Sequence, residues 1–253
     1  MKSKIKLYLQ NLSFRKLENY RAVLHGIACK WTLRHLIVGL IMSVLVYSFW
    51  LGHYEWQQDM RLWKSFGDVG YIFLAFALII GPLSKLKNGA KFLILWRREV
   101  GIWAAVLAII HGVLIVDGWI KWDVAKFFGY EFIPQLGRLA RLEPGFGLAN
   151  LIGFVAFLWL AVLAITSSDR IMRFLGGQSW KWLHTGSYIV FYLTSIHTSY
   201  FLFMHYTESF HREIAPQSVF IIPFIVSASA VLVLQFSAYI KMINMRKKHL
   251  TNT

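Results

Sequence analysis

Three histidines lie inside apolar runs of this chain and could do chemistry there. His111 lies in AAVLAIIHGVLIV, His197 in VFYLTSIHTSYFLF and His184 in WKWLHTGSY. Burying an imidazole in apolar surroundings costs free energy unless the imidazole makes a hydrogen bond or binds a metal. Two interpretations stay open at this point. The side chains are neutral imidazoles that hydrogen-bond neighbouring helices, with Ser195 close by, or they are ligands of a buried cofactor.

The remaining six histidines fall in basic or interfacial stretches, where an imidazole can reach water. We expect no cofactor role for them. They are His25, His35, His53, His205, His211 and His249.

The segments around the three histidines have the length and composition of membrane helices. Hydrophobic residues make up 57% of the 253 residues and charged residues 15%, too little charge to cover a soluble domain of this size. A helix of about 20 apolar residues crosses a hydrocarbon core of roughly 30 Å. The sequence predicts an all-α integral membrane bundle of six transmembrane helices. Their expected ranges are 35–53, 69–84, 100–118, 147–167, 182–204 and 218–240.

The distribution of Lys and Arg predicts the orientation of the bundle. Twenty of the 27 basic residues lie in segments 1–34, 84–99, 168–181 and 241–253, and seven lie in the loops of the opposite side. Cytoplasmic loops are the richer in Lys and Arg, so both termini are expected in the cytoplasm. The formal net charge of +15 is then a topology signal, and no soluble basic module points to nucleic acid.

Three domains follow from this reading. Residues 1–34 form a basic arm, expected as an amphipathic helix on the inner leaflet or as a poorly ordered segment. Residues 35–240 form the transmembrane domain, and 241–253 form a basic cytoplasmic tail. We find no internal repeat. The aromatic loop 119–146 is expected to lie against the membrane or to cap the bundle. The single cysteine, Cys29, excludes an internal disulfide.

The depth of each histidine along its helix decides which histidines could bind the same cofactor. Measured from Arg98 and Lys181, His111 lies thirteen residues into its helix and His197 sixteen. These depths are about 20 and 24 Å, whereas His184 is only about 5 Å deep. His111 and His197 can therefore face each other as an axial pair. Imidazoles without cysteine or carboxylate neighbours suit a haem iron better than zinc.

These residues also resemble a known superfamily. The runs RREVGIWAAVLAIIH at 97–111 and LAITSSDRIMRFLGGQSWKWLH at 163–184, followed by His197, are similar to the ferric reductase-like transmembrane domain. Within that superfamily the chain most resembles the haem-binding membrane subunits of the bacterial periplasmic methionine sulfoxide reductase system. The resemblance covers about residues 69–204.

The resemblance implies a multi-pass protein of the bacterial inner membrane that contains b-type haem. His111 and His197 would ligate an outer haem and His184 an inner one. The third-helix ligand of an inner haem should lie near residues 97–101, but that stretch is Arg-Arg-Glu-Val-Gly. We therefore expect one tightly bound haem, and any second cofactor to be substoichiometric or differently ligated.

The spacing of the two fifth-helix histidines raises a geometric question. His197 follows His184 by thirteen positions, which places the two side chains about 140° apart around an ideal helix. Either the helix is distorted between Gly186 and Ser195, or the two histidines address different neighbours. The resemblance favours the distortion.

In some members of the superfamily a fused domain that binds flavin and nicotinamide delivers the electrons. This chain has no G-x-G-x-x-G turn that would indicate such a domain. We expect the donor to be a cytoplasmic flavin reductase, a bound FMN or FAD, or membrane quinol. The acceptor is expected on the outer side, with a periplasmic reductase subunit as one possibility. Basic residues beside His184 could bind an acidic flavoprotein or phosphate groups, or could only fix the topology. They are Arg97, Arg98, Arg170, Arg173 and Lys181.

Two rival functions stay open. One is a quinol-oxidising cytochrome b subunit of another reductase. The other is a transporter or assembly scaffold whose histidines only join helices.

Overall fold

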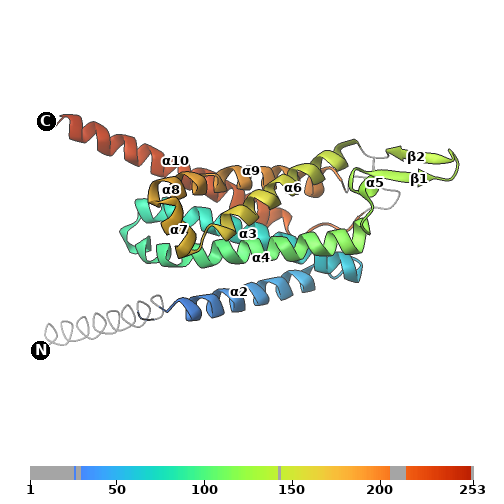
Figure 1. Cartoon of the computed structure of the whole chain (residues 1–253), viewed down its shortest axis with the longest axis horizontal. Coiled ribbons are helices and arrows are strands. Elements are labelled where there is room, and N and C mark those ends of the chain that lie inside the picture. Colours follow the sequence, from blue (N-terminus) through green and yellow to red (C-terminus); the bar gives the residue numbers. More distant parts are fainter. Residues whose placement is uncertain (1–25, 27–29, 142–143, 206–214, 252–253) are drawn as a thin grey trace, which may run out of the picture.

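The computed structural model describes residue 26 and residues 30–141, 144–205 and 215–251. It is an elongated helical bundle with one small hairpin of strands (Figure 1). The elements in chain order are α2 (Trp31–Gly52), α3 (Gln58–Leu86), η1 (Asn88–Trp96), α4 (Arg97–Leu114), η2 (Ile115–Ile120), α5 (Val124–Phe127), β1 (Tyr130–Ile133), β2 (Arg138–Arg141), α6 (Pro144–Ile165), α7 (Asp169–Leu175), α8 (Gly177–Thr185), α9 (Ser187–Phe203) and α10 (Ile221–Thr251).

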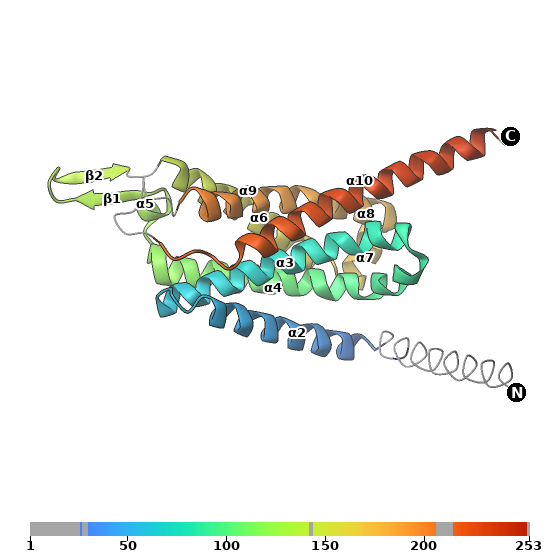
Figure 2. The same cartoon turned by 180° about the vertical axis from the view of Figure 1, so that it is seen from behind.

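The bundle has two ends, which we name by their connections. At the hairpin end, α2 turns into α3 and the strands β1 and β2 project beyond the helices (Figure 1). At the η1 end, α3 passes through η1 into α4, and α6 passes through α7 and α8 into α9. Figure 2 shows from behind that α2 begins and α10 ends at this η1 end.

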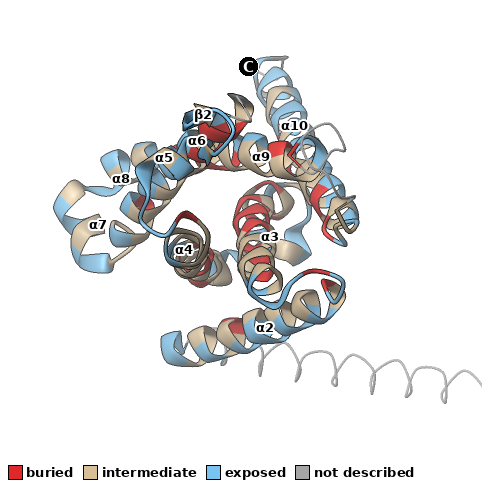
Figure 3. Cartoon of the chain, turned by 90° about the vertical axis from the view of Figure 1, so that its right-hand side faces the viewer, coloured by how far each residue is buried: buried red, intermediate tan, exposed pale blue. Residues whose placement is uncertain are grey.

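Helix α3 forms the centre of the core. It packs against α2, α4, α9 and α10, while α6 packs against α9 and α4. In Figure 3 the buried residues concentrate on α3 and on the inner faces of its neighbours. Tyr71 joins α3 to α9 because its hydroxyl lies 2.9 Å from the Ser195 hydroxyl, and its ring packs against Phe191, Phe220 and Phe224.

The outer faces of the bundle are apolar. On α2 the exposed residues Leu36, Leu40, Val44, Tyr47 and Leu51 follow one another at helical spacing. An apolar stripe of this length on a soluble protein would be a site of aggregation, but it suits a helix surrounded by lipid. Five segments among the described residues have the length and composition to cross a membrane: Trp31–Gly52, Gln58–Leu86, Asn88–Ile120, Gly145–Ile165 and Ile221–Lys248.

The helical membrane bundle predicted from the sequence is therefore confirmed, whereas the count of six stays a prediction. The expected segment 182–204 is divided between the end of α8 and the 17-residue α9. The division lies at Gly186, inside the stretch where a distortion was expected. There a Cβ atom would lie 2.7 Å from Nε1 of Trp159.

One expectation about the connections was wrong. Segment 54–68 is mostly the first part of α3, since its charged residues find partners that the hydropathy pattern does not reveal. The basic segment after residue 240 continues α10 as helix to Thr251. The predicted all-α class fits the structure, whose one strand pair is the short hairpin of β1 and β2, in which Tyr130 pairs with Arg141 and Ile133 with Arg138. The amphipathic arm and Cys29 lie outside the described residues, apart from the end of the arm at 30–34.

Candidate cofactor-binding site

A cavity of about 430 Å³ lies among α3, α4, η2, α6 and α9 towards the hairpin end. This volume falls in the range of about 300–1,000 Å³ that is usual for small-molecule and cofactor sites. Small residues on facing helices make room for it: Gly67, Gly70, Ala104, Ala108, Gly112, Gly153 and Ala156. Most other lining residues are aliphatic or aromatic. Trp119 and Phe127 are among them, so the segment 119–146 contributes to the lining.

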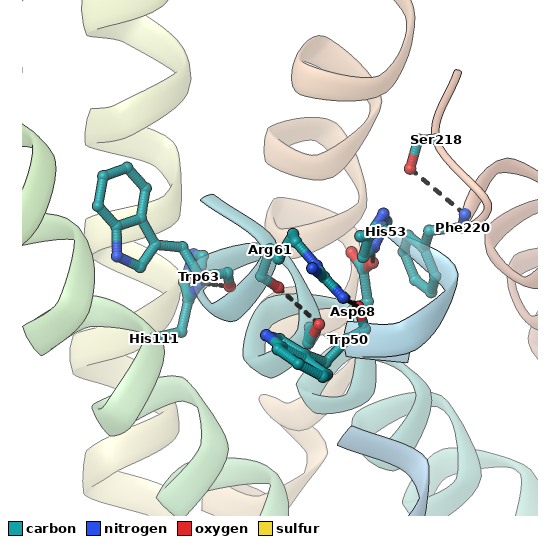
Figure 4. A network of polar contacts seen from close by, with 9 residues as sticks. Trp50, His53, Arg61, Trp63, Asp68, His111, Ser218 and Phe220 are labelled. Carbon is teal, nitrogen blue, oxygen red and sulfur yellow. Dashed lines mark hydrogen bonds and ion pairs between the residues drawn. The ribbon is translucent and has the colours of Figure 1, made fainter. Parts of the chain in front are cut away.

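His111 lines this cavity from α4. Its Nδ1 atom lies 2.8 Å from the backbone carbonyl oxygen of Trp63 on α3 (Figure 4). A carbonyl oxygen can only accept a hydrogen bond, so Nδ1 must be the donor. In a neutral imidazole the lone pair then resides on Nε2. This is the tautomer that a ligand histidine uses when its other nitrogen is held by the protein.

His197 lines the same cavity from α9 and is held in the same way. Its Nδ1 atom lies 2.8 Å from the carbonyl oxygen of Ala149 on α6. The two carbonyls come from the sixth residues of α3 and α6, both at the hairpin end. The structure thus brings His111 and His197 to one cavity near one level, each with Nε2 as the nitrogen that bears the lone pair.

Glycines allow both imidazoles to reach these carbonyls. In an α-helix the carbonyl of residue i faces residue i+4. Those residues are Gly67 for Trp63 and Gly153 for Ala149. A Cβ atom at Gly153 would lie 2.5 Å from Nδ1 of His197, and one at Gly67 would lie 3.0 Å from Nδ1 of His111. The ring therefore lies directly on the helix backbone at each site.

The two histidine sites share one spacing. The carbonyl, the glycine and the histidine of the first site each precede their counterparts in the second by 86 residues. The pairs are Trp63 and Ala149, Gly67 and Gly153, and His111 and His197. The hairpin α3–α4 thus has the same plan as the hairpin formed by α6 and α9. The sequence analysis found no repeat, and the shared spacing concerns these three pairs of positions.

His184 does not line the cavity. It lies on α8 at the η1 end, where its Nε2 atom is 3.2 Å from the Thr166 hydroxyl and its ring stacks on Trp180 at 4.1 Å between centroids. The residue 86 positions before it is Arg98, whose Nη1 atom lies 2.6 Å from Oδ1 of Asp169. The structure therefore places no histidine at the position of α4 that corresponds to His184.

The basic residues expected at the η1 end divide into two groups. Arg97 joins helices, since its Nε atom donates to the carbonyl of Ala77 on α3 at 3.0 Å. Arg98 forms the ion pair described above. Arg170, Arg173 and Lys181 are exposed on α7 and α8.

Two histidines that were expected to reach water are buried. His53 is 1% exposed, and its Nε2 atom lies 2.8 Å from Oδ2 of Asp68. His205 is 4% exposed and packs against Trp119 and Phe146. His25 and His211 lie outside the described residues, as does the side chain of His249. Within the described residues, no group of three or more His, Cys, Asp or Glu could hold a metal ion.

Comparison with known proteins shows the family to which the chain is similar. Residues 66–195 match the family model described as the ferric reductase like transmembrane component. The haem-binding subunit MsrQ of protein-methionine-sulfoxide reductase from Azospira oryzae is 32% identical over 166 residues, 62% of this chain and 64% of that protein. MsrQ from Herminiimonas arsenicoxydans is 30% identical over 53% of this chain and 55% of its own length.

A second kind of relative is much longer. The magnetosome protein MamZ of Magnetospirillum gryphiswaldense is 30% identical over 137 residues, 53% of this chain but 18% of MamZ. The chain thus spans about half of one curated relative and less than a fifth of another.

Proposed function

Since the chain belongs to the ferric reductase-like transmembrane component family, we propose that it is a membrane electron-transfer subunit with His111 and His197 as axial ligands of one b-type haem. The matched pair of carbonyl-held imidazoles in one cavity is the observation that supports this most directly. Relatives named as haem-binding subunits agree with it.

The residues of the cavity suit such a cofactor. Each histidine is fixed by its Nδ1–H bond, so the Nε2 lone pairs are oriented before any ligand binds. The glycines and alanines on facing helices leave room for a flat ring system, and the apolar walls exclude water from it. When bound, the haem iron would accept and release one electron at a time. The protein would set its potential through the two imidazoles and the dry surroundings.

The orientation of the subunit follows from its charges. We place the η1 end at the cytoplasm, with six membrane-spanning helices and both termini on that side, because the basic segments collect there. The transmembrane domain would cover residues 35–240, between the basic arm and the basic extension of α10. The membrane would be the inner membrane of a bacterium.

The donor and the acceptor would lie on opposite sides of this membrane. The donor would be a cytoplasmic flavin reductase, a bound flavin or quinol. Arg170, Arg173 and Lys181 are exposed at the η1 end and provide a basic surface for an acidic donor. A partner reductase would accept electrons at the hairpin end.

Haem content tests the proposal. His111→Ala and His197→Ala should each abolish or severely reduce bound haem in purified protein, while membrane insertion is unchanged. His35→Ala, on α2 outside the cavity, is the matched control and should retain the wild-type amount. A split b-type absorption band in the wild type separates this function from a non-redox transporter or scaffold. Full haem content in both cavity mutants would refute the axial pair.

A further inference from the structure

The cavity that contains His111 and His197 has one polar wall. Lys64 and Asp68 on α3 are the only charged side chains among the described residues that line it. They are four residues apart, so they lie on the same face of α3 as Gly67 and close to the histidine held there.

Further groups join this wall at the turn between α2 and α3. The Nε2 atom of His53 lies 2.8 Å from Oδ2 of Asp68, as Figure 4 shows. His53 is almost fully buried, and its Nδ1 atom has no hydrogen-bond partner among the described residues. The Nζ atom of Lys64 lies 4.0 Å from the centre of the Trp56 ring. A partly buried cation, a hydrogen-bonded His–Asp pair and an imidazole nitrogen without a hydrogen-bond partner among the described residues therefore meet at one edge of an apolar cavity.

The same 86-residue offset allows the charged wall to be compared with the wall formed by α6. Asn150 and Phe154 occupy the positions that correspond to Lys64 and Asp68, and both also line the cavity. The Asn150 amide donates to the carbonyl of Phe127 at 2.9 Å. The wall formed by α6 is thus neutral where the wall formed by α3 is charged.

We propose that Lys64, supported by the His53–Asp68 pair, binds the propionate carboxylates of the haem, so that the acidic edge of the macrocycle faces α3. This rests on the proposed function. Haem is an apolar plate with two carboxylates on one edge. A buried carboxylate needs a cation or several donors, and Lys64 is the only cation that the described lining offers. The Nε2 atom of His53 lies within hydrogen-bond distance of the Asp68 carboxylate, which lies beside Lys64 on the same wall.

Esterified haem tests the assignment, because the dimethyl ester keeps the ring and the iron but has no carboxylates. Apoprotein in detergent is titrated with haem and with haem dimethyl ester, and the two dissociation constants are compared. Hydrogen bonds to charged groups contribute about 1.5–3 kcal/mol, so the wild type should prefer the free acid by about tenfold to a hundredfold. Lys64→Met should bind both forms equally, whereas Lys64→Arg should keep most of the preference.

The control is Lys126→Met, which removes an exposed charge at the same end of the bundle and should leave the wild-type preference unchanged. Lys64→Gln replaces Lys64→Met if the latter does not give monodisperse protein. Equal affinity of the wild type for both forms, or an undiminished preference in the neutral variants, overturns the assignment. Failure of the proposed function looks different, because the wild type would then bind neither form.

Discussion

Gly153→Ala is the sharpest test of how the fold prepares a histidine as a ligand. The new Cβ atom would lie 2.5 Å from Nδ1 and 2.7 Å from Cε1 of His197, distances that real Cβ atoms do not show. Either the imidazole or the backbone of α6 must move. The bond from Nδ1 to the carbonyl of Ala149 is then lost or stretched, and Nε2 is no longer held in place.

The expected loss of haem affinity in Gly153→Ala has two contributions. A hydrogen bond of this kind contributes about 0.5–1.5 kcal/mol net. Forcing an additional carbon into a packed site costs about 1–3 kcal/mol. Together they predict that haem binding weakens by about 1.5–4.5 kcal/mol, or roughly 10-fold to 2,000-fold. Gly67→Ala should have a smaller effect, since its Cβ would lie 3.0 Å from His111 and a shift of a few tenths of an ångström relieves it.

The assay is haem per protein by pyridine haemochrome, with the dissociation constant from titration of apoprotein. Gly101→Ala in α4 is the control, because a Cβ atom there meets nothing within 4 Å. Alanine also favours a helix interior over glycine by about 0.5–1 kcal/mol, so this variant should be no less stable than the wild type. Haem binding in Gly153→Ala equal to that in Gly101→Ala would refute the reasoning. So would a larger loss in Gly67→Ala than in Gly153→Ala.

Two further predictions concern the η1 end. His184→Ala should leave the ratio of haem to protein near one, since Arg98 stands where a second histidine would be needed and a guanidinium offers no lone pair. A wild-type ratio near two that falls to one in this mutant would contradict it. Arg34→Met should lower the melting temperature in detergent more than Glu99→Gln. Arg34 pairs with the fully buried Glu99 at 2.8 Å. Removing Arg34 leaves a buried carboxylate without its cation, which lowers the free energy of unfolding by about 3–5 kcal/mol. The opposite order of melting temperatures would show that Glu99 is not ionised in the fold.

The depth argument from sequence was enough to place His111 and His197 together. It needed only the rise of a helix and the segments in which the basic residues fall, because a membrane span fixes the height of each residue. The same argument separated His184 from the pair, and the structure puts His184 outside the cavity. Helix type and relative depth are local properties, so a single sequence contains them.

The residues that hold the histidines were not predictable in this way. Gly67 and Gly153 look like ordinary small residues of membrane helices until the partner helix is known. Lys64 and Asp68 interrupt an apolar run, so hydropathy assigned them to a loop. In the structure His53 contacts Asp68 across a turn that no pattern specified. Pairing between helices decides whether a charged residue ends a span or belongs to its interior.

The two ends of the bundle differ in their histidines. At the hairpin end, α3 with α4 and α6 with α9 each provide a carbonyl, a glycine four residues later and a histidine on the other helix of the pair. At the η1 end His184 lies on α8, and the position 86 residues earlier is Arg98, which is bound to Asp169 of α7. A single histidine cannot complete a bis-histidine site. The hairpin end therefore provides a pair of imidazoles, whereas Arg98 and Asp169 give the η1 end, which we assign to the electron donor, an ion pair where a second histidine would be needed.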